Sequence, residues 1–374
     1  MHRHCRGMTA VLLMLLAAGA GAQEYASFEV LLQLNTASAE KTLELYEGLA
    51  GRPSDVAALP GSRIALSTTA ALARRPLTLA QLERSLEAVK YNQDLGDDIF
   101  RMKEAREHAA QIKELLLLLR SRNFTQRVVS TVAQLFPADV RVSTRLPLFV
   151  VAFGHQNIDA YVQRVVWRGG EPVNVGEGQG EVTIVVNLAK AVSYGHSADE
   201  RFLGLLTVVA HEVFHAVFSV YKTGSPAWRQ YYQSYRRPFD QLLDLAQNEG
   251  VAYYLNLVQR SRGTLPQDWD VKVGGAFDTF NRAAEEMLLP STSQARAYDL
   301  LLRSNTSGYW ENYGAITGMI VARQIDRTLG RAALAQTLNS GPHAFFSIYA
   351  DLMRQDDSIP RLSFRVLEEV SRVR

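Results

Sequence analysis

The stretch VVAHEVFHAV, residues 208–217, places two histidines four residues apart in an apolar run, with a glutamate directly after the first histidine. Residues four apart lie on one face of an α-helix, so the imidazoles of His211 and His215 can converge on a single metal ion. Glu212 projects about 100° away around the helix, near enough to reach a water molecule on that ion. This HExxH spacing predicts two metal ligands, His211 and His215, and a catalytic base, Glu212.

The helix that carries this motif has clear ends. Ser197 and Glu200 form a capping box at its start, and Gly224 marks its end. Within residues 202–221, Glu212 is the only formally charged residue. An ionisable triplet in a buried helix needs compensation, which a metal ion supplies. Two alternatives remain: a pair of core histidines bonded to carbonyl groups with Glu212 solvated, or a transmembrane helix, for which this segment is long enough.

A catalytic zinc ion usually takes three protein ligands and leaves one position for water. The only cysteine, Cys5, lies in a segment that we expect to be removed, so the third ligand must be His, Asp or Glu. Residues 240–260 (DQLLDLAQNEGVAYYLNLVQR) form one expected helix, in which Glu249 lies in an apolar stripe. A carboxylate there is costly without a cation, which makes Glu249 the candidate third ligand. The alternative is a partly solvated Glu249 paired with an arginine.

Gly250 follows Glu249 in the middle of this expected helix. Glycine costs about 1 kcal/mol relative to alanine at such a position. The cost is tolerable where another element packs closely, so the glycine predicts a close contact beside Glu249.

HEVFH followed by a lone glutamate on a second helix, 34 residues after His215, resembles the gluzincin-type zinc metallopeptidases. NEGVAYYL is similar to their glutamate helix, and SAEKTLELYEGLA and GPHAFFSIYADL resemble bacterial families described as zinc-dependent peptidases. The resemblance implies a zincin-like fold and a zinc ion held by His211, His215 and Glu249. One departure concerns the residue four positions after the third ligand, which is acidic in many gluzincins and is Tyr253 here. The partner that orients the first histidine is therefore unassigned.

The resemblance also implies a residue that stabilises the oxyanion of the reaction. YWENYGAITGMIVARQIDRTLG, residues 309–330, looks like a later helix of these enzymes that can contribute a tyrosine. Tyr313, which precedes a glycine-containing helix, is the first candidate for this catalytic role, and Tyr309 is the second. The alternative is a packing tyrosine, since the chain has 15 tyrosines.

Three short segments rich in β-branched and aromatic residues predict strands, at 146–154, 161–167 and 181–188. Helical periodicity is found at 38–50, from 78 to about 135, and after residue 197. We therefore expect a predominantly helical α+β protein, in which a small β-sheet is followed by the HExxH helix and then the glutamate helix. The expected division is an N-terminal helical region at 23–145 and a zincin-like metallopeptidase domain at 146–374. The strand at 181–188 either lies at the edge of the cleft, where it can pair with an extended substrate, or is buried in the sheet.

The chain has 374 residues, 47% of them hydrophobic and 21% charged, an ordinary composition for a globular protein. Its 40 basic and 38 acidic side chains give a net charge of +2, which favours neither a nucleic-acid partner nor a polybasic membrane contact. The basic opening, the apolar run at 11–18 and the A-x-A spacing of Ala20 and Ala22 predict a signal peptide at 1–22. We therefore expect a periplasmic or secreted protein without a membrane span in the mature chain; the alternative is an uncleaved membrane anchor.

The sequence therefore predicts an exported zinc-dependent peptidase, a hydrolase whose substrate is a peptide or protein. Zinc polarises the scissile carbonyl and lowers the pKa of its bound water toward ~7, and Glu212 takes the proton of this water and delivers it to the leaving amine. The alternative is a catalytically inactive zinc-binding scaffold or peptide-binding protein of peptidase ancestry. The intact Glu212 argues against this alternative, because a site that only binds metal does not require a base.

Overall fold

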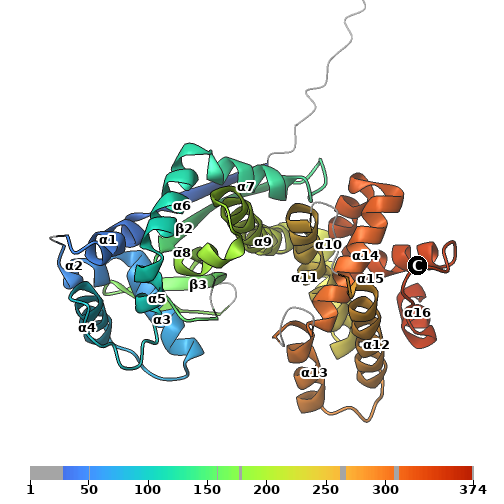
Figure 1. Ribbon diagram of the computed structural model, residues 1–374. Coiled ribbons are helices and arrows are strands. Elements are labelled where there is room, and N and C mark those ends of the chain that lie inside the picture. Colours follow the sequence, from blue (N-terminus) through green and yellow to red (C-terminus); the bar gives the residue numbers. More distant parts are fainter. Residues whose placement is uncertain are drawn as a thin grey trace, which may run out of the picture.

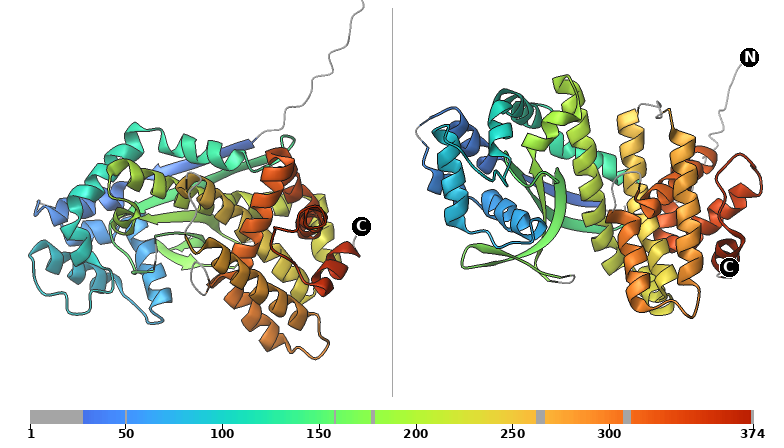
Figure 2. Two further views of the ribbon diagram at one scale, coloured as in Figure 1. Left: turned by 45° about the vertical axis from the view of Figure 1, so that its right-hand side comes forward. Right: turned by 60° about the horizontal axis from the view of Figure 1, so that its bottom comes forward.

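The computed structural model describes residues 28–49, 51–157, 159–176, 179–261, 267–306 and 311–372. The expected signal peptide at 1–22 and the second tyrosine candidate, Tyr309, lie outside these residues. The described chain forms two lobes that meet at a long helix, α9 (Ala198–Gly224) (Figures 1 and 2). The first lobe contains the sheet, and the second consists of helices.

The sheet of the first lobe has five strands in the order β1-β2-β5-β3-β4. Their bounds are β1 Phe28–Asn35, β2 Val142–Val151, β3 Ala160–Arg168, β4 Glu171–Asn174 and β5 Glu181–Asn187. β1, β2 and β5 run parallel, and β3 is antiparallel to both β5 and β4. All three expected strands are present. β1 was not expected, because it depends on pairing Phe28 with Val142, and local patterns do not show pairing at that distance.

Two strands matter for the position of a cleft. β5 lies between β2 and β3 and its residues 183–187 are buried, so the segment at 181–188 is a buried strand and not a cleft edge. β3 has a strand on only one side over residues 160–163 in the described part of the chain, since its pairing with β4 begins at Val165. β3 also packs against α9, so this partly open edge lies beside the HExxH helix.

Helices surround the sheet in the first lobe (Figure 1). They are α1 Ala37–Tyr46, α2 Pro53–Ala57, α3 Pro60–Leu72, α4 Leu79–Lys90, α5 Met102–Glu107, α6 Ala109–Ser121, α7 Phe124–Ala133 and α8 Leu188–Ala191, which leads into a 3-10 turn at Val192–Tyr194. α2 and α3 begin at Pro53 and Pro60. Proline suits the first turn, because the N–H groups there have no acceptor within the helix.

The second lobe is entirely helical in its described residues. Its helices are α10 Pro226–Ser234, α11 Pro238–Ser261, α12 Trp269–Met287, α13 Gln294–Thr306, α14 Tyr313–Leu329, α15 Arg331–Met353 and α16 Phe364–Ser371. α11 packs against α9 on one side and against α14 on another. The expected fold class, a predominantly helical α+β protein with a small sheet before the HExxH helix, is confirmed.

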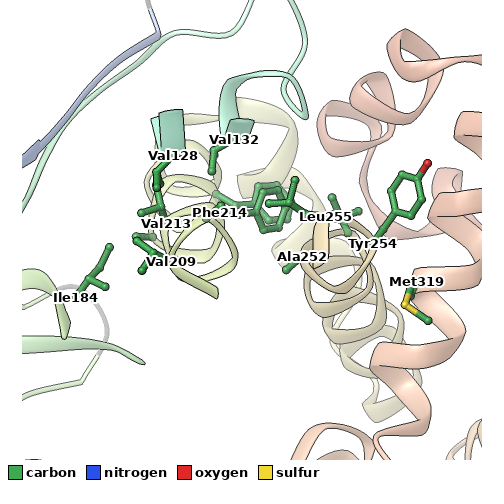
Figure 3. Packing of buried hydrophobic residues seen from close by; sticks show 14 of the residues in the cluster. Val128, Val132, Ile184, Val209, Val213, Phe214, Ala252, Tyr254, Leu255 and Met319 are labelled. Atoms are coloured by element: carbon green, nitrogen blue, oxygen red, sulfur yellow. The ribbon is translucent and has the colours of Figure 1, made fainter. Parts of the chain in front are cut away.

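α9 is a core helix shared by the two lobes. Val209 and Val213 face β5 and α7, whereas Phe214 lies on the side of α11 (Figure 3). By length and composition alone α9 is apolar enough to cross a membrane. Of its apolar stretch of 18 residues, 67% is buried inside the structure. Packing against both lobes therefore accounts for its apolar sequence.

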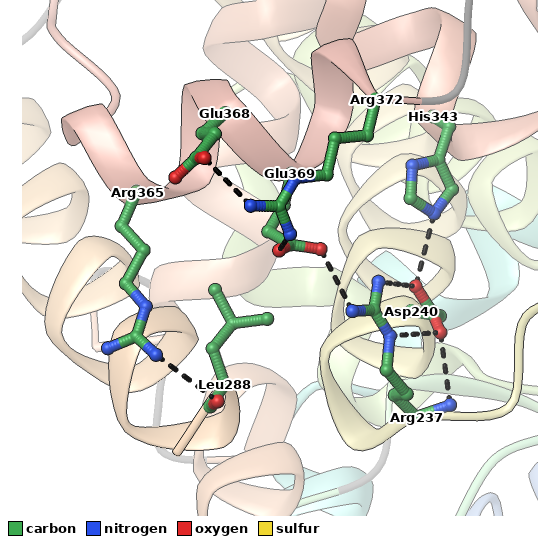
Figure 4. A network of polar contacts seen from close by, with 8 residues as sticks. All are labelled: Arg237, Asp240, Leu288, His343, Arg365, Glu368, Glu369 and Arg372. Atoms are coloured by element: carbon green, nitrogen blue, oxygen red, sulfur yellow. Dashed lines mark hydrogen bonds and ion pairs between the residues drawn. The ribbon is translucent and has the colours of Figure 1, made fainter. Parts of the chain in front are cut away.

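A polar network ties the start of α11 to the last two helices (Figure 4). The carboxylate of Asp240 accepts hydrogen bonds from the guanidinium of Arg237 and, at 3.1 Å, from Nε2 of His343 on α15. Arg237 also pairs with Glu369 of α16 at 2.8 Å. Burial raises the pKa of Asp240, but the hydrogen bonds from His343 and Arg237 outweigh it and hold the pKa below its usual value. The network therefore anchors the first turn of the helix that carries the candidate third ligand.

Candidate metal centre

His211 and His215 lie one turn apart on α9 and direct their Nε2 atoms to the same place. These two atoms are 3.0 Å apart, and the rings meet edge to face with centroids 4.6 Å apart. The side chains are only 12% and 18% exposed. The HExxH spacing thus places the two imidazoles as expected.

Glu249 joins the histidines from α11. Its Oε2 atom is 3.3 Å from Nε2 of His215 and 3.8 Å from Nε2 of His211. Three ligand atoms bound to zinc at about 2.0–2.2 Å in a tetrahedral arrangement stand roughly 3.3–3.6 Å apart, so the observed separations are close to those that this ion requires. The structure therefore brings His211, His215 and Glu249 together in a group that can hold a metal ion, which we call the metal-capable group.

The charges of this group compensate one another when no ion is bound. Burial lowers the pKa of His215, but the carboxylates of Glu249 and Glu212 raise it to about 9. Burial likewise raises the pKa of Glu249, but His215 and a hydrogen bond from Asn305 of α13 lower it to about 2. The largely buried carboxylate of Glu249 and imidazole of His215 thus stabilise each other in their charged forms. A divalent cation supplies the same compensation for Glu249 and leaves the histidines neutral as ligands.

The Nδ1 atoms of both histidines have partners on α11. Oδ1 of Asn248 lies 3.2 Å from Nδ1 of His215, and Nδ2 of Asn256 lies 3.4 Å from Nδ1 of His211. Sequence reasoning missed both asparagines. A signal for each was present, since Asn248 directly precedes Glu249 and Asn256 follows it by two helical turns on the same face.

Glu212 points toward the sheet rather than toward α11. Its carboxylate accepts a hydrogen bond from the backbone N–H of Val162 on β3. Burial raises the pKa of Glu212 to about 8; the positive charge of His215 opposes this shift, and the carboxylates of Glu249 and Asp159 add to it. The carboxyl group therefore lies beside the metal-capable group, between it and the partly open edge of β3.

A close crossing of two helices fixes the position of Glu249. Gly250 of α11 lies against Gly318 of α14, and a Cβ atom on Gly250 would be 2.2 Å from the carbonyl carbon of Gly318. Two backbones approach this closely only where side chains are absent. The close contact expected beside Glu249 is present, and it explains the glycine in mid-helix. The ion-pair partners of Glu249 in the described residues are the two histidines and not an arginine.

Tyr313 is not brought to this group. Its side chain is 4% exposed, and its hydroxyl donates to the backbone carbonyl of Leu300 on α13. The first turn of α14 faces α13, so Tyr313 has the packing position that was the alternative to a catalytic role. Tyr253 does contact the group: its ring centroid is 5.4 Å from that of His211. The hydroxyl of Tyr253 accepts a hydrogen bond from Nδ2 of Asn312 at 2.9 Å.

A cavity of about 610 Å³ begins at His215 and Glu249. It follows the groove between α9 and α11 and is bounded by residues of α10. Its wall contains an ion pair between Lys222 of α9 and Asp244 of α11, whose second oxygen accepts from the hydroxyl of Tyr232. The metal-capable group thus has a cavity directly beside it whose wall includes charged and polar side chains.

A family model described as "Putative zinc dependent peptidase (DUF5700)" matches residues 55–358. The chain belongs to this family. The matched range covers most of the chain and includes every residue of the candidate metal centre. No curated protein and no solved structure matches the chain. Because the family is described as zinc-dependent and the structure holds a suitable His/His/Glu group, zinc is the cofactor. Membership also supports peptidase activity, the general function that the family description names.

Proposed function

We propose that the chain is a gluzincin-type zinc peptidase in which His211, His215 and Glu249 hold the ion and Glu212 is the general base. The observation that carries this proposal is the convergence of three ligand atoms from two helices, at separations of 3.0, 3.3 and 3.8 Å. When bound, zinc polarises the scissile carbonyl and lowers the pKa of a water molecule. The remaining steps belong to the side chains around it.

Glu212 has the placement that a general base needs. The N–H of Val162 orients its carboxylate, and its position between the metal-capable group and β3 lets it meet both water and substrate. A carboxyl group with a pKa of about 8 is mostly protonated at neutral pH, but a nearby dication lowers this pKa because positive charge favours the carboxylate. Glu212 then takes the proton of the attacking water and passes it to the leaving amine.

The substrate strand is proposed to lie along β3. An extended peptide can add to an open sheet edge through main-chain hydrogen bonds, and residues 160–163 of β3 form such an edge next to Glu212. This replaces the segment 181–188, which is buried. The cavity between α9 and α11 is then available to a substrate side chain.

Tyr253 is proposed as the second donor to the oxyanion. Its ring rests on His211, and Asn312 holds its phenol oxygen. Tyr313, by contrast, uses its hydroxyl to bind the carbonyl of Leu300. A donor near the metal ligand is the requirement for stabilising the tetrahedral intermediate, and of these two tyrosines only Tyr253 contacts a ligand.

Export to the periplasm or beyond is proposed from residues 1–22 alone. The mature protein should begin after Ala22, which N-terminal sequencing of secreted material would establish. A mature protein that retains these residues would support the membrane-anchor alternative.

The proposed activity is tested with purified, zinc-loaded protein and a mixture of peptides of diverse sequence, analysed by mass spectrometry. Wild type should cleave internal or terminal peptide bonds, whereas Glu212→Gln should keep its zinc and lose at least about 10²-fold in rate. Glu44→Gln, an exposed change on α1, is the matched control and should cleave as wild type does. Cleavage by Glu212→Gln at the wild-type rate would remove the base. A zinc-loaded wild type that cleaves nothing would favour the scaffold alternative.

A further inference from the structure

Asn256 of α11 contacts the first histidine of the candidate metal centre. Its Nδ2 atom is 3.4 Å from Nδ1 of His211, and Asn256 is only 9% exposed. Its other polar atom, Oδ1, is buried and has no hydrogen-bond partner among the described residues. A buried carbonyl oxygen is normally paired, so this arrangement calls for an explanation.

The chemistry of a metal ligand decides which atom of Asn256 belongs next to His211. Nε2 of His211 faces Nε2 of His215 and Oε2 of Glu249, so Nε2 is the atom that must keep its lone pair for an ion. A neutral imidazole then carries its proton on Nδ1, which becomes a donor. The amide nitrogen of Asn256 is also a donor. Two donors do not form a hydrogen bond, and the acceptor required at this place is a carbonyl oxygen.

We infer that Asn256 is a positioning residue: with zinc bound, its Oδ1 accepts a hydrogen bond from Nδ1–H of His211 and so fixes the tautomer and rotation of the ring. The inference rests on the proposed zinc site. The oxygen and nitrogen of a carboxamide have nearly the same size, so a 180° rotation of the amide exchanges them within the same space. This rotation also gives the unpartnered oxygen a donor.

The neighbouring residues explain why this role falls to Asn256. Tyr253, four residues after Glu249, packs its ring edge-on against His211, and its hydroxyl accepts a hydrogen bond from Asn312. Asn256 is one turn further along the same face of α11. It supplies an acceptor without a charge, while Glu212 and Glu249 already bring two carboxylates to the divalent ion. A neutral acceptor leaves more of the charge of the ion to polarise a substrate.

The test compares Asn256→Leu with Gln247→Leu. Gln247 is a matched control, because it is a buried carboxamide on the same helix whose oxygen also lacks a hydrogen-bond partner in the described part of the chain. Its Nε2 donates to the carbonyl of Thr337, away from the histidines. The zinc Kd of the full chain is measured by competition with a chelator, and the cobalt-substituted protein is examined by visible absorption. Asn256→Leu should weaken zinc binding about 10–100-fold and alter the cobalt spectrum, whereas Gln247→Leu should stay within about threefold of wild type.

Asn256→Asp tests the orientation of the amide and serves also if the leucine variant does not fold. Aspartate keeps an acceptor and removes the N–H₂ group, so its zinc Kd should equal or improve on that of wild type. A loss of tenfold or more in Asn256→Asp would overturn the inference, as would a wild-type zinc Kd in folded Asn256→Leu. A wild-type chain that binds no zinc would instead overturn the proposed function itself.

Discussion

Replacing Gly250 by alanine tests whether the close crossing of α11 and α14 positions the third ligand. The added methyl carbon would stand 2.2 Å from the carbonyl carbon of Gly318, 2.4 Å from its Cα and 2.6 Å from the nitrogen of Met319. Non-bonded carbons rest about 3.5–4.0 Å apart, so the two helices must separate by roughly 1 Å or more. Overpacking of this kind costs about 1–3 kcal/mol, and alanine returns about 1 kcal/mol of helix propensity. We therefore expect Gly250→Ala to lower the free energy of unfolding by up to about 2 kcal/mol.

The same displacement should move Glu249, which precedes Gly250, and weaken zinc binding by about tenfold or more. Stability is measured by urea denaturation of the metal-free protein, followed by circular dichroism, and the zinc Kd by chelator competition. Gly274→Ala in α12 is the control, because a Cβ atom there meets nothing within 4 Å. It should stabilise the protein by up to about 1 kcal/mol and leave the zinc Kd unchanged. If Gly250→Ala is as stable as Gly274→Ala and binds zinc as well, the helix crossing does not position Glu249.

Three further predictions concern the network, the tyrosines and the metal. Asp240→Asn should lower the free energy of unfolding by about 1.5–3 kcal/mol at pH 7. Since the folded-state pKa of Asp240 is lowered, its contribution to stability is fully present above the unfolded pKa of about 3.9 and is lost as pH falls through the lower folded-state pKa. The free energies of unfolding of wild type and Asp240→Asn should therefore converge in acid, and a constant difference between them would contradict this. Tyr253→Phe should lower kcat about 10²-fold with the zinc Kd retained, whereas Tyr313→Phe should keep kcat and lose about 1 kcal/mol of stability; the reverse pattern would restore Tyr313 as the donor. Free zinc at a thousandfold excess over its Kd should stabilise the folded chain by about 4 kcal/mol relative to the chelator-treated protein, and no change in the unfolding midpoint would argue against a preformed site.

The candidate ligands are predictable from the sequence because their signals are local. His211 and His215 follow from a spacing of four on one helix, and Glu249 from its place in an apolar stripe. The residues that surround these ligands could not be predicted from the sequence, because they are set by which helices pack together. The contact of Tyr253 with His211 and the partnership of Asn256 arise from the packing of α11 on α9.

The expectations that the structure does not bear out have the same origin. Strand β1 lies in a region that was expected to be helical, because its pairing with β2 is a long-range contact. Tyr313 was chosen through the resemblance of one segment, and that choice contained no information about the direction of the first turn of α14. The unpaired part of β3 likewise becomes visible only when the order of the strands is known.

The central claim is that one divalent ion is held jointly by α9 and α11, and its most direct test is the zinc content of purified protein. Zinc per chain is measured by mass spectrometry of the metal after dialysis against metal-free buffer, for wild type, Glu249→Ala and the control Glu44→Ala. We predict about one zinc per chain in wild type and in Glu44→Ala, and a small fraction of that in Glu249→Ala, because two histidines alone bind zinc weakly. Equal zinc in wild type and Glu249→Ala would contradict the claim that α11 supplies a ligand.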